Sequence, residues 1–203
     1  MLAGRYRLHE PFGRGGMGVV WRAWDELLCQ TVAIKEVTPP SGLPAAEHGE
    51  HLRRTLREAR TAARLRGHPG IVTIYDVVEE DGRPWIIMEL IDGPSLAEVL
   101  RTEQRLPEER VAELGMEVIS ALAAAEAAGV VHRDVKPGNI LLKHGRPVLT
   151  DFGIAMALDS TGLTRNGALV GTPAYLAPEQ IEGRPASAAS DLWAVGVTLY
   201  EAV

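Results

Sequence analysis

The segment VHRDVKPGN, residues 131–139, brings together five polar side chains of different chemistry: His132, Arg133, Asp134, Lys136 and Asn139. The Asp134 carboxylate can orient an attacking hydroxyl or accept its proton. Lys136 can neutralise charge on a phosphoryl group during transfer, and the amide oxygen of Asn139 is a reasonable Mg²⁺ ligand. A polar surface turn would not need this combination. The segment is therefore a candidate catalytic site.

The tripeptide DFG, residues 151–153, begins twelve positions beyond Asn139. Asp151 is a hard oxygen ligand placed just after a predicted strand, and Phe152 supplies an apolar anchor. A lone DFG is common by chance, but this spacing is not. Together, Asn139 and Asp151 predict a site for Mg²⁺ or Mn²⁺.

The stretch GRGGMGVV, residues 13–20, places Gly13, Gly15 and Gly18 in the pattern G-x-G-x-x-G. Without side chains, these positions let backbone N–H groups approach phosphate oxygens. A dinucleotide-binding loop has the same pattern but opens a helix, whereas the residues that follow here read as a strand. The alternative is a glycine-rich hairpin that binds nothing.

Lys35 ends the apolar run VAIK, and a buried ammonium group needs a partner. Glu58, on a predicted helix, is the preferred candidate. In the alternative interpretation, Lys35 faces solvent on an edge strand and Glu58 pairs with Arg54 one helical turn away. These two residues alone do not decide between the alternatives.

The composition of the 203 residues is typical of a globular protein, with 46% hydrophobic residues and a net charge of -6. The negative charge argues against nucleic acid or an anionic membrane as a partner. No apolar run is long enough to span a membrane, and the first residues lack a signal-peptide core. Cys29 is the single cysteine, which fits a reducing compartment, and it is interpreted as an apolar filler rather than a nucleophile. We expect these residues to be cytoplasmic.

Periodicity divides the chain into a strand-rich part, residues 1–90, and a helix-rich part, residues 91–203. Strands are predicted at 6–12, 19–24, 31–37, 71–78, 83–90, 139–143 and 146–150. Helices are predicted at 48–70, with buried Leu52, Leu56, Ala59 and Ala63, and at 107–129, with buried Val111, Leu114, Val118, Leu122 and Ala125. A last apolar helix is predicted at 190–203. This α+β pattern predicts two lobes with a ligand site in the crevice between them.

With these motifs in order, the stretches HRDVKPGNI, GTPAYLAPEQ and SDLWAVGVTLYE make the sequence resemble the protein kinase family. The residues of these three stretches are similar to those of the bacterial eukaryotic-like (Hanks-type) serine/threonine branch of the family. The resemblance covers essentially the whole chain. It implies a bilobal protein-kinase fold, with an antiparallel-sheet N-lobe plus one helix and a mainly helical C-lobe.

The resemblance also implies residue roles. Asp134 would be the catalytic base, Lys136 would contact the γ-phosphate, and Lys35 paired with Glu58 would hold the other phosphates. Asn139 and Asp151 would bind the metal ion. The residues expected at ATP are Phe12, Gly13, Arg14, Gly15, Gly16, Gly18, Val20, Ala33, Lys35, Met88, Glu89, Ile91 and Leu141. Lysine two residues after the catalytic Asp goes with serine or threonine hydroxyls of protein substrates.

Regulation by phosphorylation of the segment before GTPAY is a further implication. A phosphate on Thr164, or next on Thr161 or Ser160, would pair with Arg133 and order the segment. Thr172 would support the substrate-binding loop and contact Asp134. Phosphorylation in trans would involve a kinase dimer.

The family's C-lobe continues beyond the helix that begins near Ser190, so the chain is interpreted as a C-terminally truncated kinase. Trp193, Val197, Leu199 and Tyr200 would normally be covered, and we expect a poorly stable chain. The sequence does not decide whether a missing C-terminal part of the parent protein carries a membrane anchor. The alternative function is an inactive nucleotide-binding fragment or scaffold. A small-molecule phosphotransferase is disfavoured by Lys136 and the long segment ending in APE.

Overall fold

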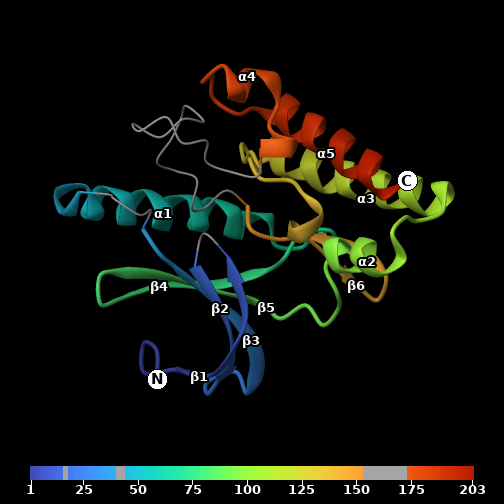
Figure 1. Cartoon of the computed structure of the whole chain (residues 1–203). Helices are drawn as coiled ribbons and strands as arrows, with labels where there is room; N and C mark the ends of the chain where they lie inside the picture. Colours follow the sequence, from blue (N-terminus) through green and yellow to red (C-terminus); the bar gives the residue numbers. More distant parts are fainter. Residues whose placement is uncertain (16–17, 40–43, 153–172) are drawn as a thin grey trace. The chain divides into compact units, whose positions relative to one another are not determined.

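The computed structural model describes residues 1–15, 18–39, 44–152 and 173–203 (Figure 1). Contacts divide the chain into two compact units. The first comprises Met1–Arg66 and Thr73–Leu90, and the second comprises Gly67–Val72 and Ile91–Val203. The first holds a sheet and one long helix, and the second is mainly helical, as the sequence predicts.

The first unit is built on a five-stranded antiparallel sheet in the order β1-β2-β3-β5-β4. Each predicted strand of this region is present, because runs of β-branched and aromatic residues are separated by turns. The strands are β1 (Tyr6–Gly15), β2 (Gly18–Asp25), β3 (Gln30–Val37), β4 (Ile74–Glu80) and β5 (Arg83–Glu89).

The two faces of this sheet have different neighbours. One face carries an apolar cluster made of Leu2, Tyr6, Ala23, Val32, Ile34 and Ile87. Because side chains alternate along a strand, Ala33 and Lys35 lie on the opposite face of β3. Helix α1 (His48–Ala62) packs against β4 and β5, preceded by the 3₁₀ turn η1 (Ala45–Glu47) and followed by η2 (Ala63–Leu65).

The buried stripe of α1 differs in part from the predicted one. Leu56 and Ala59 are buried as expected, but Leu52 and Ala63 are only half-buried. Their places are taken by His51, Thr55 and Ala62. The helix is rotated so that two polar side chains enter the interior. The apolar periodicity did not indicate this rotation, because it counts only apolar positions.

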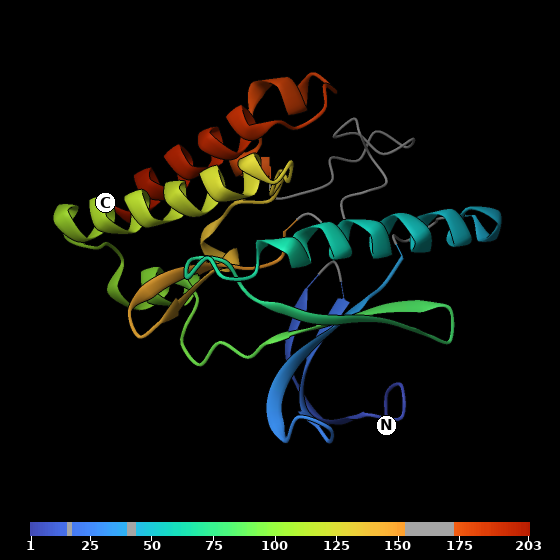
Figure 2. The same ribbon diagram turned by 180° about the vertical axis from the view of Figure 1, so that it is seen from behind.

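The second unit contains two long helices that lie side by side, α3 (Glu108–Ala127) and α5 (Ala188–Ala202), as Figures 1 and 2 both show. Every predicted core position of α3 is buried. Gly115 permits the close packing, since a Cβ there would lie 2.8 Å from the Leu199 side chain. Trp193 and Tyr200 on α5 are exposed. No helix within the described ranges is long and apolar enough to cross a bilayer.

The remaining elements of this unit are short. Strands β6 (Ile140–Lys143) and β7 (Arg146–Leu149) form the predicted antiparallel pair. Helix α4 (Pro178–Ile181) and the 3₁₀ turns η3 (Pro137–Asn139) and η4 (Pro173–Tyr175) also belong to this unit.

Helix α2 (Leu96–Glu103) is an element that the sequence analysis missed. Its signal is present, because Ser95 and Glu98 form a capping box in which each side chain bonds the other residue's backbone N–H. Leu96 and Leu100 supply its buried face. With eight residues, the helix is too short to give a distinct apolar periodicity.

Candidate active site

Asp134 lies at the centre of a compact polar cluster, and only 8% of its surface is exposed. The ammonium group of Lys136 donates to both carboxylate oxygens, at 3.0 and 2.8 Å. The amide nitrogen of Asn139 donates to Asp134 Oδ2 at 2.9 Å and to its backbone oxygen at 2.7 Å. The structure therefore brings together three residues that the sequence predicted to act in one site.

His132 orients the backbone of this loop from below the surface, where it is fully buried. Its Nε2 lies 2.9 Å from the carbonyl oxygen of Thr150, which can only accept, so Nε2 carries the proton. Nδ1 then accepts from the N–H of Asp134 at 3.3 Å. Burial lowers the pKa of His132, which keeps the imidazole neutral. Its ring packs against Phe152 with centroids 4.5 Å apart.

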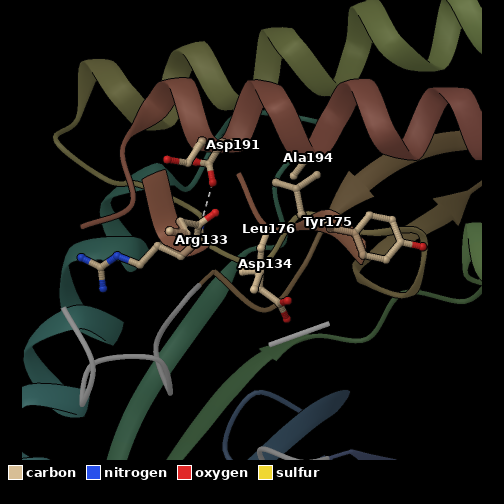
Figure 3. Close-up of a pocket in the computed structure, with 9 residues that line it drawn as sticks. Arg133, Asp134, Tyr175, Leu176, Asp191 and Ala194 are labelled. Carbon is tan, nitrogen blue, oxygen red and sulfur yellow. Dashed lines mark hydrogen bonds between the residues drawn. The ribbon is translucent and has the colours of Figure 1, made fainter. Parts of the chain in front are cut away.

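Asp191 on α5 anchors the loop from the other side, a role that the sequence analysis did not assign. Its carboxylate accepts hydrogen bonds from the backbone N–H groups of His132 and Arg133, both at 2.7 Å, and Figure 3 shows the side chain next to Arg133. Burial raises the pKa of Asp191. An aspartate in an otherwise apolar helix was the available signal, because a buried carboxylate needs donors.

Arg133 adopts the left-handed conformation, with φ of 70°. This conformation is unfavourable for a residue with a Cβ and is maintained only where surrounding contacts fix it. The bond from the Arg133 N–H to Asp191 supplies one such contact. The position of Asp134 is thus set by a strained backbone that a neighbouring helix holds.

Asn139 and Asp151, the predicted metal ligands, are connected through Thr150. The N–H and hydroxyl of Thr150 both donate to the carbonyl oxygen of Asn139, at 2.9 and 3.2 Å. Asp151 follows directly and has a left-handed backbone, with φ of 60°. Because the amide nitrogen of Asn139 faces Asp134, its amide oxygen is turned away from that carboxylate. These oxygen donors fit a hard divalent cation.

Lys35 and Glu58 both belong to the first unit. Lys35 is 7% exposed, so the alternative that it faces solvent is wrong. Glu58 lies on α1 with its Oε1 3.8 Å from Arg54 Nε, which is the contact that the alternative expected for Glu58. At that length the contact is weak, and the pairing of Lys35 with Glu58 stays a prediction.

The glycine-rich stretch ends β1 and starts β2, with Gly15 opposite Gly18. A Cβ at Gly18 would lie 1.8 Å from the carbonyl oxygen of Glu36, and its φ is 134°. Glycine is therefore required at Gly18 by the neighbouring strand, independently of any ligand. Gly13 has no such restriction, because a Cβ there would meet Val20 at ordinary contact distance.

The residues expected around adenine are distributed over both units. Val20, Ala33, Met88 and Glu89 lie on the sheet, with Phe12 exposed on β1. The N–H of Glu89 donates to Thr73 at 2.8 Å, so it is already engaged within the protein. Ile91 and Leu141 belong to the second unit.

Several predicted site residues lie outside the described residues. These are Gly16 in the glycine-rich stretch and Thr161, Thr164 and Thr172 in the segment predicted to be regulatory. Arg14 is described only as a strand position in β1. A small pocket beside Asp134 is lined by Arg133, Tyr175, Leu176 and Asp191, among others (Figure 3).

Comparisons with known proteins agree with this arrangement. The sequence model of a protein family, the protein kinase domain, matches residues 6–203. The chain is 43% identical to the serine/threonine-protein kinase PkaA of Streptomyces coelicolor over 100% of this chain and 39% of that protein. It is 43% identical to the serine/threonine-protein kinase PknA of Mycobacterium tuberculosis, again over the whole chain and over 47% of that protein.

The serine/threonine-protein kinase PrkC of Bacillus subtilis is 40% identical over 98% of this chain and 30% of its own length. The chain thus spans less than half the length of these curated relatives. The names support the predicted serine/threonine kinase and do not favour the inactive scaffold. With a family match that extends over nearly every residue, the chain belongs to the protein kinase family.

Proposed function

We propose that this chain is the catalytic part of a bacterial serine/threonine protein kinase, which transfers the γ-phosphate of ATP to serine or threonine hydroxyls of other proteins. The observation that carries the proposal is the cluster in which Asp134 is held by Lys136 and Asn139. Membership of the family implies use of ATP and a divalent metal ion in general.

In the proposed reaction, Asp134 orients the protein hydroxyl and accepts its proton as the oxygen attacks phosphorus and ADP leaves. Lys136 lies within hydrogen-bond distance of that carboxylate, so its positive charge is available to the phosphoryl group in transfer. The bonds from Asp191 to the loop backbone keep both residues in position before substrate arrives.

We assign the metal site to Asn139 and Asp151 and propose Mg²⁺ as the ion, with Mn²⁺ as a substitute. When bound, the ion would supply positive charge to the phosphate oxygens. The amide oxygen of Asn139 faces away from Asp134, and Asp151 follows the residue whose backbone is bonded to Asn139. These contacts support the assignment, because they link the backbones of the two residues through Thr150 and leave the Asn139 amide oxygen available to a cation.

The first unit would bind the nucleotide. We propose that Lys35 contacts the α- and β-phosphates with Glu58 as its partner, and that the stretch around Gly13 and Gly18 covers the phosphates. The burial of Lys35 supports this role, because an ammonium group in an apolar sheet must meet negative charge. Val20, Ala33 and Met88, with Leu141 and the backbones of Glu89 and Ile91, would receive the adenine.

Regulation would act through Arg133. A phosphate on Thr164, or on Thr161, would pair with this guanidinium and order the segment that contains Thr172. Protein substrates, a dimer for phosphorylation in trans, and a cytoplasmic kinase domain in a longer protein are proposed on the same basis.

The test is the intact mass of the purified chain after incubation with ATP and Mg²⁺, beside an Asp134→Asn variant. Added phosphate in the wild type alone supports the proposal, and peptide mapping then locates it. If the wild type gains no mass and phosphorylates no Ser/Thr peptide library while still binding ATP, the chain is the inactive nucleotide-binding fragment instead.

A further inference from the structure

Helix α1 and the 3₁₀ turn η2 that continues it carry four exposed arginines, at positions 53, 57, 60 and 64. We call these four residues the arginine stripe. Their spacing of four, three and four residues is the repeat of one helix face. At 100° per residue they fall within an arc of about 60°. The arginines therefore form one continuous line about 16 Å long at 1.5 Å per residue.

The arginine stripe lies on the side of α1 opposite to its buried face. The centre of the buried face, formed by His51, Thr55, Leu56, Ala59 and Ala62, is about 160° around the helix from the centre of the stripe. The helix can be followed along its length in Figure 2. Packing of α1 on β4 and β5 therefore leaves the guanidinium groups pointing away from the sheet.

The arginine stripe contains no ion pair, in contrast to many other arginines of the chain. Within the described part of the chain, none of its four side chains forms a salt bridge or hydrogen bond with another residue. Glu50, one turn before Arg53, is also not paired with it. Ion pairs are formed instead by Arg5, Arg7, Arg54, Arg83, Arg110, Arg146 and Arg184.

An unpaired row of like charges opposes helix formation. Like charges three or four residues apart on a helix destabilise it, and the stripe contains such pairs throughout. In a chain of net charge -6, this concentration of positive charge on one helix is a local exception. We propose that the arginine stripe is a docking surface for an acidic segment of a partner protein.

Charge and spacing favour a polypeptide. Side chains on one face of an extended peptide repeat about every 6.6 Å, close to the 4.5–6 Å steps of the arginine stripe. Carboxylates at alternate positions would thus meet successive guanidinium groups, which bind carboxylates through two parallel hydrogen bonds. A short acidic segment meets only the arginine stripe, whereas nucleic acid and anionic membranes extend their negative charge over the rest of a chain whose net charge is -6.

The proposal is tested with a fluorescein-labelled peptide of alternating Glu and Ala, and with a Gln and Ala peptide as its neutral counterpart. Fluorescence anisotropy measures binding to the chain at low and at high salt. The Arg57→Gln, Arg60→Gln double variant should bind the acidic peptide about tenfold more weakly, because two charge-assisted contacts are lost. Binding of the wild type should also weaken with salt.

The matched control is the Arg22→Gln, Arg105→Gln double variant. It removes the same charge from two exposed arginines elsewhere in the described chain that are also outside ion pairs. It should bind the acidic peptide as the wild type does, and circular dichroism should give equal helix content for all three proteins. Equal loss in both variants would reduce the effect to net charge and overturn the proposal.

Other occupants give different outcomes. Tighter binding of a single-stranded oligonucleotide or of phosphatidylserine vesicles than of the acidic peptide would overturn the choice of a polypeptide. A concentration-dependent dimer by sedimentation that the stripe variant abolishes would assign the surface to a second copy instead. Neither result depends on phosphotransfer activity, so the proposal can fail while the proposed function stands.

Discussion

Asp25 in the first unit and Asp191 in the second are two buried aspartates whose carboxylates both bind backbone N–H groups. Their pKa values are nevertheless shifted in opposite directions. Each accepts hydrogen bonds from two consecutive N–H groups, of Leu27 and Leu28 at 3.0 and 3.2 Å, and of His132 and Arg133 at 2.7 Å. They are 1% and 4% exposed. Yet the pKa of Asp25 is lowered and that of Asp191 is raised.

The difference follows from a counter-charge. The Arg5 guanidinium forms two parallel bonds with Asp25, at 2.8 and 2.6 Å, and this pair holds the pKa of the carboxyl below its usual range. Asp191 lies deep in the second unit, where the effect of burial on its pKa outweighs the backbone hydrogen bonds from His132 and Arg133 and the charge of Arg133. Backbone donors alone therefore do not fix the protonation of a carboxyl, and a paired cation decides it.

The largest effect that separates the two sites is expected from Asp191→Ala. It leaves two buried N–H groups without an acceptor, which should cost about 3 kcal/mol of unfolding free energy. Because a displaced loop misplaces Asp134, phosphotransfer should fall about 100-fold or more. Urea unfolding and a peptide phosphorylation assay measure the two losses. An active, fully stable variant would remove the anchoring role.

The corresponding change Asp25→Ala should cost about 2 kcal/mol, since Arg5 and the turn N–H groups remain close enough to the surface to be hydrated. Among the residues that the structure describes, the side chain of Asp25 is hydrogen-bonded to Arg5, Leu27 and Leu28 and to no candidate site residue, so the catalytic rate should be unchanged below the unfolding temperature. Thermal unfolding followed by rate measurement at a lower temperature checks this. A rate loss equal to that of Asp191→Ala would contradict the distinction.

A smaller change tests whether the polar contacts around Arg5 and Asp25 extend to Tyr6 and Asp76 as a stabilising network. The hydroxyl of Tyr6 donates to Asp76 at 2.9 Å, and Arg5 Nη1 lies 3.7 Å from the same carboxylate. Tyr6→Phe removes one neutral donor and should cost about 1 kcal/mol by urea unfolding. A cost near zero would limit the stabilising network to Arg5 and Asp25.

The smallest expected effect is a pH dependence of opposite sign at the two sites. A lowered pKa means that the contribution of Asp25 to stability is present above its unfolded pKa of about 3.9 and is lost as pH falls through the folded value. A raised pKa means that the contribution of Asp191 is fully present below about pH 3.9 and is lost as pH rises through its folded pKa.

The measurement compares unfolding free energies of the wild type with Asp25→Asn and with Asp191→Asn between about pH 7 and pH 3.5. On acidification, the difference should grow for Asp191→Asn and should shrink for Asp25→Asn only near the acid end. His132 contributes in the opposite direction, because its lowered pKa makes protonation unfold the protein. Repeating the series with His132→Phe in every protein separates the two groups.

Much of the fold and the cluster around Asp134 could be predicted from sequence. The strands of the first unit follow from apolar runs between turns, and the buried positions of α3 follow from its repeat. Asp134, Lys136 and Asn139 are within six positions of each other, so a short local loop is enough to join them. Contacts between side chains so close in sequence can be predicted from the sequence itself.

Features that depend on distant residues could not be predicted in the same way. The rotation of α1 that buries His51 and Thr55 is set by packing on β4 and β5. The need for glycine at Gly18 comes from the carbonyl of Glu36 on the next strand, although the pattern suggested a phosphate. Asp191 reaches across 59 positions to His132, and only its apolar surroundings hinted at a partner.

The anchoring of the catalytic loop by α5 has a consequence for synthesis of the protein. Translation proceeds from the N-terminus, so His132, Arg133 and Asp134 leave the ribosome well before Asp191 does. Until α5 emerges, the N–H groups of His132 and Arg133 lack their acceptor, and the strained backbone at Arg133 lacks that support. A nascent chain thus carries the reactive carboxylate in an unassembled loop. The order of the residues delays catalytic competence until the last described helix has folded.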